Sequence, residues 1–168
     1  MAVEFEELRD SEVLWIKDQT EAAVGFVDKY SPGDAGQPLT LDALDRAFSV
    51  WLISESPETD EVNAVINAVG IAFGSFLVRD AGFSWTVATD EHGCEMAVLA
   101  LPGQADVLVY PANFVAKRWE RREASFLAAS FAKIDNETKN LAEKLRQAGG
   151  DDGGNSRPPW WKRLFKGV

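Results

Sequence analysis

The sequence predicts an α+β fold in which N-terminal helices pack on a three-stranded antiparallel meander, followed by a long C-terminal helix and a flexible tail. Three observations predict it. Apolar residues recur at helical spacing through the first half of the chain, they alternate with polar residues from Phe83 onward, and a heptad stripe follows residue 124. The 168 residues, 46% of them hydrophobic, fit one compact domain over residues 1–148.

Three helices are expected before residue 80. The first runs from about Ser11 to Lys29, with a cap at Asp10 or Ser11 and a buried face formed by Val13, Ile16, Ala23 and Val27. The second begins after the capping residue Thr40 and runs through Ile53. The third begins at Ser56-Pro57, because a capping residue followed by proline is a helix start signal, and it runs to about Arg79.

Two glycines interrupt the third helix. Gly70 and Gly74 lie four residues apart, on one face. Each costs the helix about 1 kcal/mol relative to alanine. The simplest compensation is the close approach of another backbone, and a ligand-facing groove is the alternative.

The segment from Phe83 to Tyr110 predicts three antiparallel strands. Phe83, Trp85 and Val87 alternate with polar or small residues, which indicates one buried face. The segment Asp90–Gly93 predicts a hairpin turn. The next strands, Glu95–Leu101 and Val107–Tyr110, are apolar on both faces and are expected to be covered on both sides.

A short helix from Ala112 to about Trp119 and a long helix from about Ala124 to Gln147 complete the domain. The long helix carries a narrow heptad stripe of Leu127, Phe131, Ile134, Thr138, Leu141, Leu145 and Ala148. Such a stripe packs on its own domain or, alternatively, forms a homodimer through residues 124–147.

One stretch of the sequence resembles a known family. The glycine-spaced helix with Gly70 and Gly74, the GFSW entry at residues 82–85, the DEHG turn at residues 90–93 and the YPANFVAKRWE segment at residues 110–120 are similar to the bacterial domain-of-unknown-function family numbered 3806. The similarity covers about residues 62–123. It implies a small bacterial α+β domain and brings no activity or catalytic residue with it.

The residues show no catalytic set, and we predict no metal and no cofactor. His92 is the only histidine and Cys94 the only cysteine, so the sequence has no Cys/His metal motif. No phosphate-binding glycine loop is present. Asp90 and Glu91 are adjacent turn acids, which normally face solvent. A small-molecule or enzymatic pocket, the alternative, would lie between the glycine-bearing helix and the meander, lined by Trp85, Tyr110 and Trp119.

Charge is distributed unevenly along the chain. The formal net charge is −10, which argues against a nucleic-acid partner because such partners require basic residues to neutralise phosphates. Most of the negative charge falls in residues 1–62. A basic cluster of Lys117, Arg118, Arg121 and Arg122 follows the strands. We expect it to pair with the acidic N-terminal helices or a second subunit; binding a phosphate or an acidic partner is the alternative.

The C-terminal tail combines a linker with a peptide rich in aromatic and basic residues. Residues 149–156 contain no apolar side chain and predict a flexible linker. Residues 157–168 follow as an aromatic and basic peptide whose candidate partner-binding residues are Trp160, Trp161, Lys162, Arg163, Leu164 and Phe165. One helical turn would gather these aromatic side chains on one face. The peptide therefore favours docking on a protein partner, with docking on its own domain and contact with an anionic membrane surface as alternatives.

These observations predict a non-enzymatic binding or adaptor protein that engages a protein partner through its tail. An acidic immunity-type inhibitor that presents carboxylates to a basic toxin is a further alternative. The acidic N-terminus has neither the basic start nor the apolar run of a secretory signal, and no run of 18 uncharged apolar residues is present. We therefore expect the cytoplasm, with peripheral contact at the inner membrane as the alternative.

Overall fold

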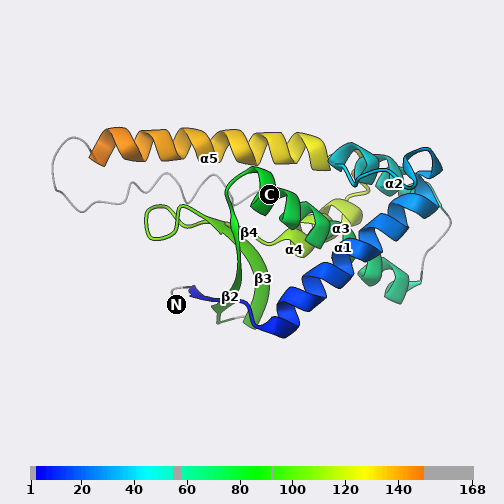
Figure 1. Cartoon of the computed structure of the whole chain (residues 1–168), viewed down its shortest axis with the longest axis horizontal. Helices are drawn as coiled ribbons and strands as arrows, with labels where there is room; N and C mark the ends of the chain where they lie inside the picture. Colours follow the sequence, from blue (N-terminus) through cyan, green and yellow to red (C-terminus); the bar gives the residue numbers. More distant parts are fainter. Residues whose placement is uncertain (1–2, 55–57, 92, 150–168) are drawn as a thin grey trace.

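The computed structural model describes residues 3–54, 58–91 and 93–149 and contains five α-helices, a short 3₁₀ helix and a four-stranded sheet (Figure 1). The elements follow in the order β1 (Glu4–Glu6), α1 (Asp10–Tyr30), η1 (Pro32–Asp34), α2 (Leu41–Ile53), α3 (Thr59–Asp80), β2 (Ser84–Asp90), β3 (Gly93–Ala100), β4 (Val107–Val109), α4 (Pro111–Glu120) and α5 (Leu127–Gly149). The predicted α+β class and the long C-terminal helix are confirmed.

The sheet has one strand more than the sequence predicted. Its order is β1-β2-β3-β4 and all neighbours are antiparallel, so the predicted meander is extended at one edge by β1. The three residues of β1 are too few, and too acidic, to show a strand pattern. Asp90 pairs with Gly93 at the predicted hairpin turn.

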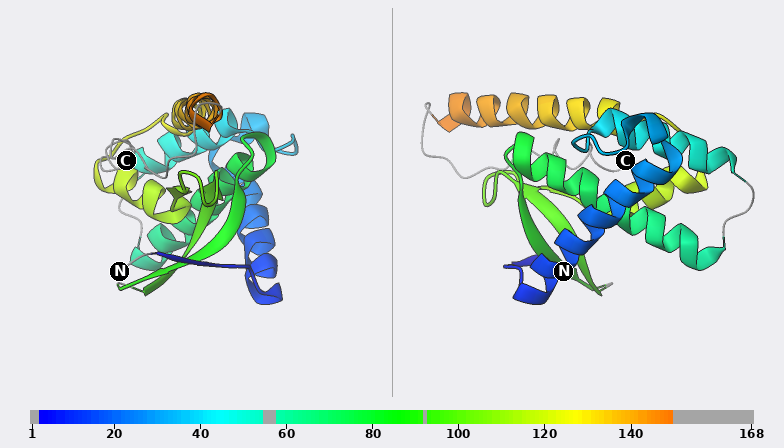
Figure 2. Two further views of the ribbon diagram at one scale, coloured as in Figure 1. Left: turned by 90° about the vertical axis from the view of Figure 1, so that its left-hand side faces the viewer. Right: turned by 45° about the vertical axis from the view of Figure 1, so that its right-hand side comes forward.

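Helix α3 is the centre of the domain. It packs against α1, α4 and one face of the sheet, and Figure 2 shows it passing behind the strands. By length and a mean hydropathy of 1.6 this helix could cross a membrane, but 67% of that stretch is buried in the domain, as in a core helix. Its start differs from the prediction: it begins at Thr59 after the N-cap Glu58, and Ser56-Pro57 lies outside the described residues.

The glycines of α3 permit the close approach that the sequence predicted. A Cβ added to Gly70 would lie 2.6 Å from the Ala112 Cα, and one added to Gly74 would lie 2.5 Å from the Trp85 ring. Helix α4 and strand β2 therefore press directly onto this face of α3. The space between the glycine face and the sheet is filled, which excludes the alternative of a ligand groove at these two glycines.

Helix α5 is held at its first turn by a carboxylate from another helix. The Leu127 N–H donates to Asp45 Oδ1 at 2.8 Å, and the Ala128 N–H donates to Asp45 Oδ2 at 3.0 Å. Asp45 lies in α2 and is 8% exposed. Within the stripe, Leu127, Ile134, Thr138 and Leu141 are buried and Ala148 is exposed, so most of this face packs within one chain.

Helix α1 departs from the prediction in its first half. It begins at Asp10, and Arg9 is its N-cap residue in place of Asp10 or Ser11; the Arg9 N–H donates to Glu12 Oε2. Ala23 and Val27 are buried as predicted, but the side chain of Val13 is 52% exposed. The second half of α1 therefore forms part of the core and the first half extends beyond it.

Candidate functional site

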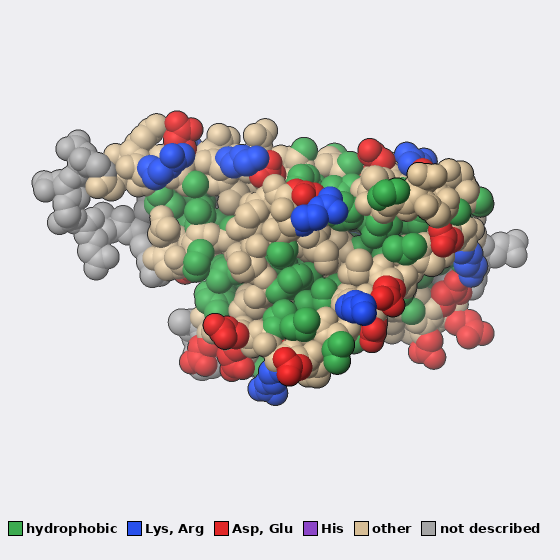
Figure 3. All heavy atoms as spheres, viewed as in Figure 1, with side chains coloured by type: hydrophobic (Ala, Val, Ile, Leu, Met, Phe, Trp, Pro, Cys, Tyr) green, Lys and Arg blue, Asp and Glu red, His purple; other side chains and the backbone are tan. Residues whose placement is uncertain are grey.

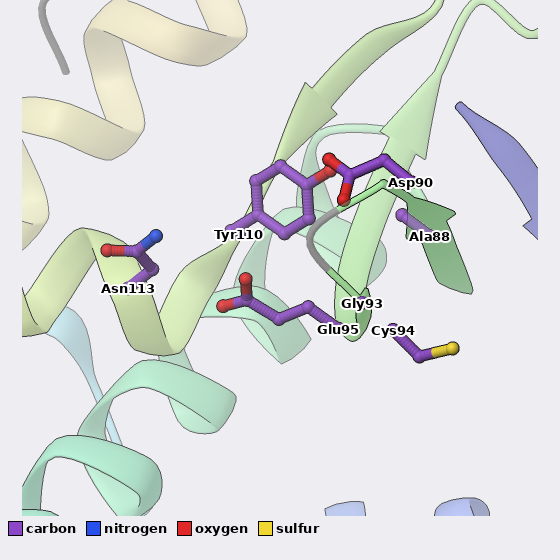
Figure 4. A pocket seen from close by; sticks show the side chains of 7 residues that line it. All are labelled: Ala88, Asp90, Gly93, Cys94, Glu95, Tyr110 and Asn113. Carbon is purple, nitrogen blue, oxygen red and sulfur yellow. The ribbon is translucent and has the colours of Figure 1, made fainter. Parts of the chain in front are cut away.

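The most polar cavity among those described lies where β3 faces the junction of β4 and α4. We call it the β3–β4 cavity; its volume is about 420 Å³ and its walls are Ala88, Asp90, Gly93, Cys94, Glu95, Tyr110 and Asn113. Figure 4 shows the Tyr110 hydroxyl beside the Asp90 carboxylate and the Glu95 carboxylate extending toward the side on which Asn113 lies, whereas the Cys94 thiol points away. Pro111 begins α4 and thereby places Tyr110 and Asn113 on the same wall.

The two acidic groups of this cavity are carried by neighbouring strands. Glu95 lies opposite Ala88 in the β2–β3 pairing, and Asp90 is two residues beyond Ala88 on the same face. Limited hydration beside the cavity wall raises the pKa of Glu95, and the negative charge of Asp90 raises it further against the opposing effect of Lys117. Burial likewise raises the pKa of Tyr110, with Asp90 and Glu95 adding to the effect. The cavity therefore favours a ligand that carries positive charge or hydrogen-bond donors.

A second cavity adjoins the first. We call it the α4–α5 cavity; its volume is about 330 Å³ and its walls are Leu108, Val109, Tyr110, Asn113, Phe114, Lys117 and Ile134. Tyr110 and Asn113 line both cavities, so the two cavities share this wall. The lining of the α4–α5 cavity is mainly apolar, with Lys117 as its one charged residue among those described.

The structure separates the three aromatic residues that the sequence placed in one pocket. Tyr110 lines both cavities. Trp85 packs against Gly74 in the filled space beside α3. Trp119 is half-buried, and the Arg122 guanidinium lies 6.0 Å from its ring. The sequence did not indicate Glu95 or Asn113 as site residues; the pairing of Asp90 with Gly93 across the hairpin places Glu95 opposite Ala88, two residues from Asp90.

The predicted basic cluster does not form one patch. Arg118 turns inward over the Phe114 ring at 4.4 Å, and its Nε lies 2.9 Å from the Glu123 carboxylate. Arg121 approaches the same carboxylate at 3.9 Å. Lys117 instead faces the α4–α5 cavity. Arg118 and Arg121 therefore pair with Glu123, which follows them by five and two residues, and not with the N-terminal helices as expected.

An exposed apolar surface occupies β1 and the first half of α1. We call it the α1 face and define it by Val3, Phe5, Val13, Leu14 and Trp15, whose exposed fractions range from 36% to 60%. Figure 3 shows hydrophobic side chains gathered over the sheet and the adjoining part of α1, with carboxylates along the lower edge. Acidic residues are interspersed in the same segment: Glu4, Glu6, Glu7, Asp10, Glu12 and Asp18.

The predicted tail residues, Trp160 to Phe165, lie outside the described residues, as does His92. Cys94 is exposed, and its sulfur lies 3.2 Å from the Thr89 hydroxyl. In residues 3–54, 58–91 and 93–149, no three His, Cys, Asp or Glu side chains are grouped so that they could hold a metal ion.

One protein family matches this chain. A family model described as Domain of unknown function (DUF3806) matches residues 47–130, half of the 168 residues. The chain belongs to the DUF3806 family. The predicted resemblance is confirmed, and the matched part extends beyond the predicted residues 62–123 on both sides. No curated protein and no solved structure matches this DUF3806 chain.

The family match divides the candidate sites. Both cavities lie in the DUF3806 region except for Ile134 on α5. The α1 face lies outside that region, before residue 47.

Proposed function

We propose that this protein is a non-enzymatic adaptor whose α1 face binds a protein partner that presents an apolar centre surrounded by basic residues. The observation that carries the proposal is the exposure of Val13, Leu14 and Trp15, at 52%, 60% and 36%. Consecutive residues of a helix point in different directions, so these three side chains expose apolar area around much of the first half of α1, and burying that area against a partner would be favourable.

Charge supports a basic partner. The carboxylates around the α1 face include Glu7, Asp10 and Asp18, which are exposed. A partner with basic residues at the rim is attracted and oriented by these carboxylates, while burial of the apolar centre stabilises the complex. An immunity-type inhibitor would use the same face, with a basic toxin as the partner.

The predicted C-terminal peptide supplies a second contact in this proposal. Trp160, Trp161, Leu164 and Phe165 carry the apolar surface, and Lys162 and Arg163 carry positive charge. The α1 face and the peptide have opposite charge, so they suit different surfaces of a partner or different partners. We retain the cytoplasm as the predicted location.

Small-molecule binding is the second candidate function. The β3–β4 cavity favours it, because Glu95, Tyr110 and Asn113 line a volume within the roughly 300–1,000 Å³ range of ligand sites. Titration with small amines and polyols, monitored by the NMR signals of the cavity residues, tests this candidate. Saturable shifts that disappear in Glu95→Gln would support it.

The adaptor is tested by affinity purification with three forms of the chain. The parent, Leu14→Ser with Trp15→Ser, and Val50→Ser are compared at low and high salt; Val50 is 46% exposed on α2 and serves as the matched control. We expect a partner that the parent and Val50→Ser retain, that the α1 double variant loses, and that high salt weakens. Equal recovery by all three forms would refute the α1 face as the binding surface.

A fourth form that ends at residue 156 tests the C-terminal peptide separately. Loss of a partner by this form alone would assign that partner to the peptide. Equal thermal stability of the four forms, measured by circular dichroism, is the control for folding.

A further inference from the structure

We propose that the α4–α5 cavity is the binding site for the chain's own C-terminal peptide, residues 157–166, bound within the same molecule. The inference deepens the proposed function and rests on it, because a peptide that is held by its own domain reaches a partner only after it is displaced. Four observations support the proposal: the apolar cavity, one buried hydroxyl, the negative charge of the adjoining cavity and the length of the chain after α5.

The apolar walls of the cavity suit aromatic side chains. Leu108 from β4, Phe114 from α4 and Ile134 from α5 line a volume of about 330 Å³. Leu108 is half-buried, so the cavity is open to a ligand that approaches from solvent. Indole and phenyl rings bury a large apolar area for the few torsions that they immobilise, which makes them suitable occupants.

A buried hydroxyl one helical turn beyond Ile134 lacks a partner among the described residues. Thr138 is 6% exposed, and its Oγ1 makes no hydrogen bond in the part of the chain that the structure describes. Thr138 follows Ile134 by one helical turn and therefore lies on the same face of α5. A buried hydroxyl without a hydrogen bond lowers the stability of the fold, and Thr138 Oγ1 could accept a hydrogen bond from a tryptophan Nε1–H.

The adjoining β3–β4 cavity supplies negative charge. Asp90 and Glu95 line it, and their mutual repulsion is relieved when a cation lies nearby. The peptide carries Arg157, Lys162, Arg163 and Lys166 around its aromatic residues. An aromatic segment in the α4–α5 cavity would place basic side chains toward these carboxylates through the shared wall at Tyr110 and Asn113.

The chain is long enough to reach this site in the same molecule. The helical path back from Gly149 to Ile134 is 15 residues, or about 22 Å at ~1.5 Å per residue. Residues 150–160 can span up to ~36 Å at ~3.3 Å per residue when extended. A chain that reverses direction after α5 therefore brings Trp160 and Trp161 to the α4–α5 cavity without strain.

The sole cysteine permits a direct test in the full chain. Cys94 is exposed, lines the β3–β4 cavity and points away from Glu95 and Tyr110, so a nitroxide label attached there lies close to the proposed site without filling it. The indole N–H signals of Trp160 and Trp161 are identified by Trp160→Phe and Trp161→Phe. We expect the label to remove most of the intensity of these two signals, and its reduction to restore it.

Two substitutions locate the contact. Leu108→Lys adds a second positive charge to the α4–α5 cavity, beside Lys117, and replaces an apolar wall, so it should restore the indole signals, whereas Leu14→Lys on the α1 face should leave them broadened. Restoration by Leu14→Lys alone would place the peptide on the α1 face and overturn the proposal. Full indole intensity in the labelled parent chain would also overturn it.

A mixture of isotope-labelled chains with separate nitroxide-labelled chains tests for a second copy. Broadening that is as strong in this mixture as in the singly labelled chain would show binding between molecules, and so overturn binding within one. These measurements do not depend on a partner. If no form of the chain retains a partner but the indole signals are broadened, the adaptor is refuted and the peptide site is supported. If a partner is retained through the α1 face but the indole signals keep full intensity, the peptide site is refuted and the adaptor is supported.

Discussion

Replacing glycine by alanine at two helical positions should change stability in opposite directions. Gly25 is an exposed residue of α1, and an added Cβ would have no heavy atom within 4 Å. Gly25→Ala should therefore stabilise the protein by about 0.5–1 kcal/mol, because alanine loses less backbone entropy in a helix. Gly70 lies inside α3 and has the same intrinsic cost.

The surroundings of Gly70 reverse the sign. A Cβ there would lie 2.6 Å from the Ala112 Cα and 2.9 Å from both the Ala112 nitrogen and the Pro111 carbonyl oxygen. All three atoms are backbone, so the start of α4 must move as a unit. Overpacking of this kind costs about 1–3 kcal/mol, and the gain in helix propensity offsets only about 1 kcal/mol. We expect Gly70→Ala to be net destabilising, by up to about 2 kcal/mol.

Thermal denaturation monitored by circular dichroism measures both variants on one scale. Thermal midpoints should rise by about 1–4 °C for Gly25→Ala and fall by up to about 8 °C for Gly70→Ala, since about 1 kcal/mol corresponds to about 2–4 °C at this chain length. If Gly70→Ala stabilises the protein as much as Gly25→Ala does, the close approach of α4 to α3 is not what requires glycine.

Three further substitutions test single groups. Asp45→Ala should destabilise the protein by about 2–3 kcal/mol in urea, because two backbone N–H groups at the start of α5 lose their acceptor, while the exposed Asp18→Ala should change stability by less than about 0.5 kcal/mol. Hydrogen bonds from Arg46 and Ser31 lower the pKa of Asp34 from 3.8 to about 2, so the contribution of this carboxylate to the free energy of unfolding is present above pH 3.8 and is lost as the pH falls toward 2. Asp34→Asn should therefore reduce the dependence of the unfolding free energy on pH between these two values. An unchanged slope would contradict the assignment. Limited hydration raises the pKa of Glu95 above 4.5, so the contribution of this carboxyl to the free energy of unfolding is greatest below that pH and is lost as the pH rises. The Glu95→Gln variant should therefore gain stability relative to the parent as the pH rises to neutrality. A stability difference that does not change with pH would refute this.

Local patterns predicted most of the fold. The alternation after Phe83 and the turn residues Asp90–Gly93 predicted β2 and β3, because pairing across a tight hairpin involves neighbours in sequence. The predicted buried face of β2 is wrong beyond Phe83, since Thr86 and Ala88 are buried and Trp85 and Val87 are only half-buried. Thr40 caps α2 as predicted, with the Ala43 N–H donating to its hydroxyl. The glycine spacing of α3 indicated a close approach but could not identify its partners, since Ala112 lies 42 residues away.

Long-range contacts account for what the sequence did not show. Strand β1 exists because Glu4, Phe5 and Glu6 find an open edge on β2, more than 80 residues later. Asp45 caps α5 across a similar separation, and no motif in either segment indicates the pair. The same limit applies to the cavities, because Glu95 and Tyr110 meet only through the pairing of β3 with β4.

The position of the family match separates the two candidate functions. The β3–β4 cavity lies wholly within residues 47–130, and so do the elements that shape it, β2, β3, β4 and the start of α4. A ligand bound there would engage the part of the chain that the DUF3806 model describes. The α1 face and the C-terminal peptide lie outside it, and Ile134, which lines the α4–α5 cavity, comes from the part of α5 that follows the matched residues. Partner binding and its control by the peptide therefore use segments added around the shared domain, so a second family member without α1 and the peptide should keep the cavity chemistry and lose the partner.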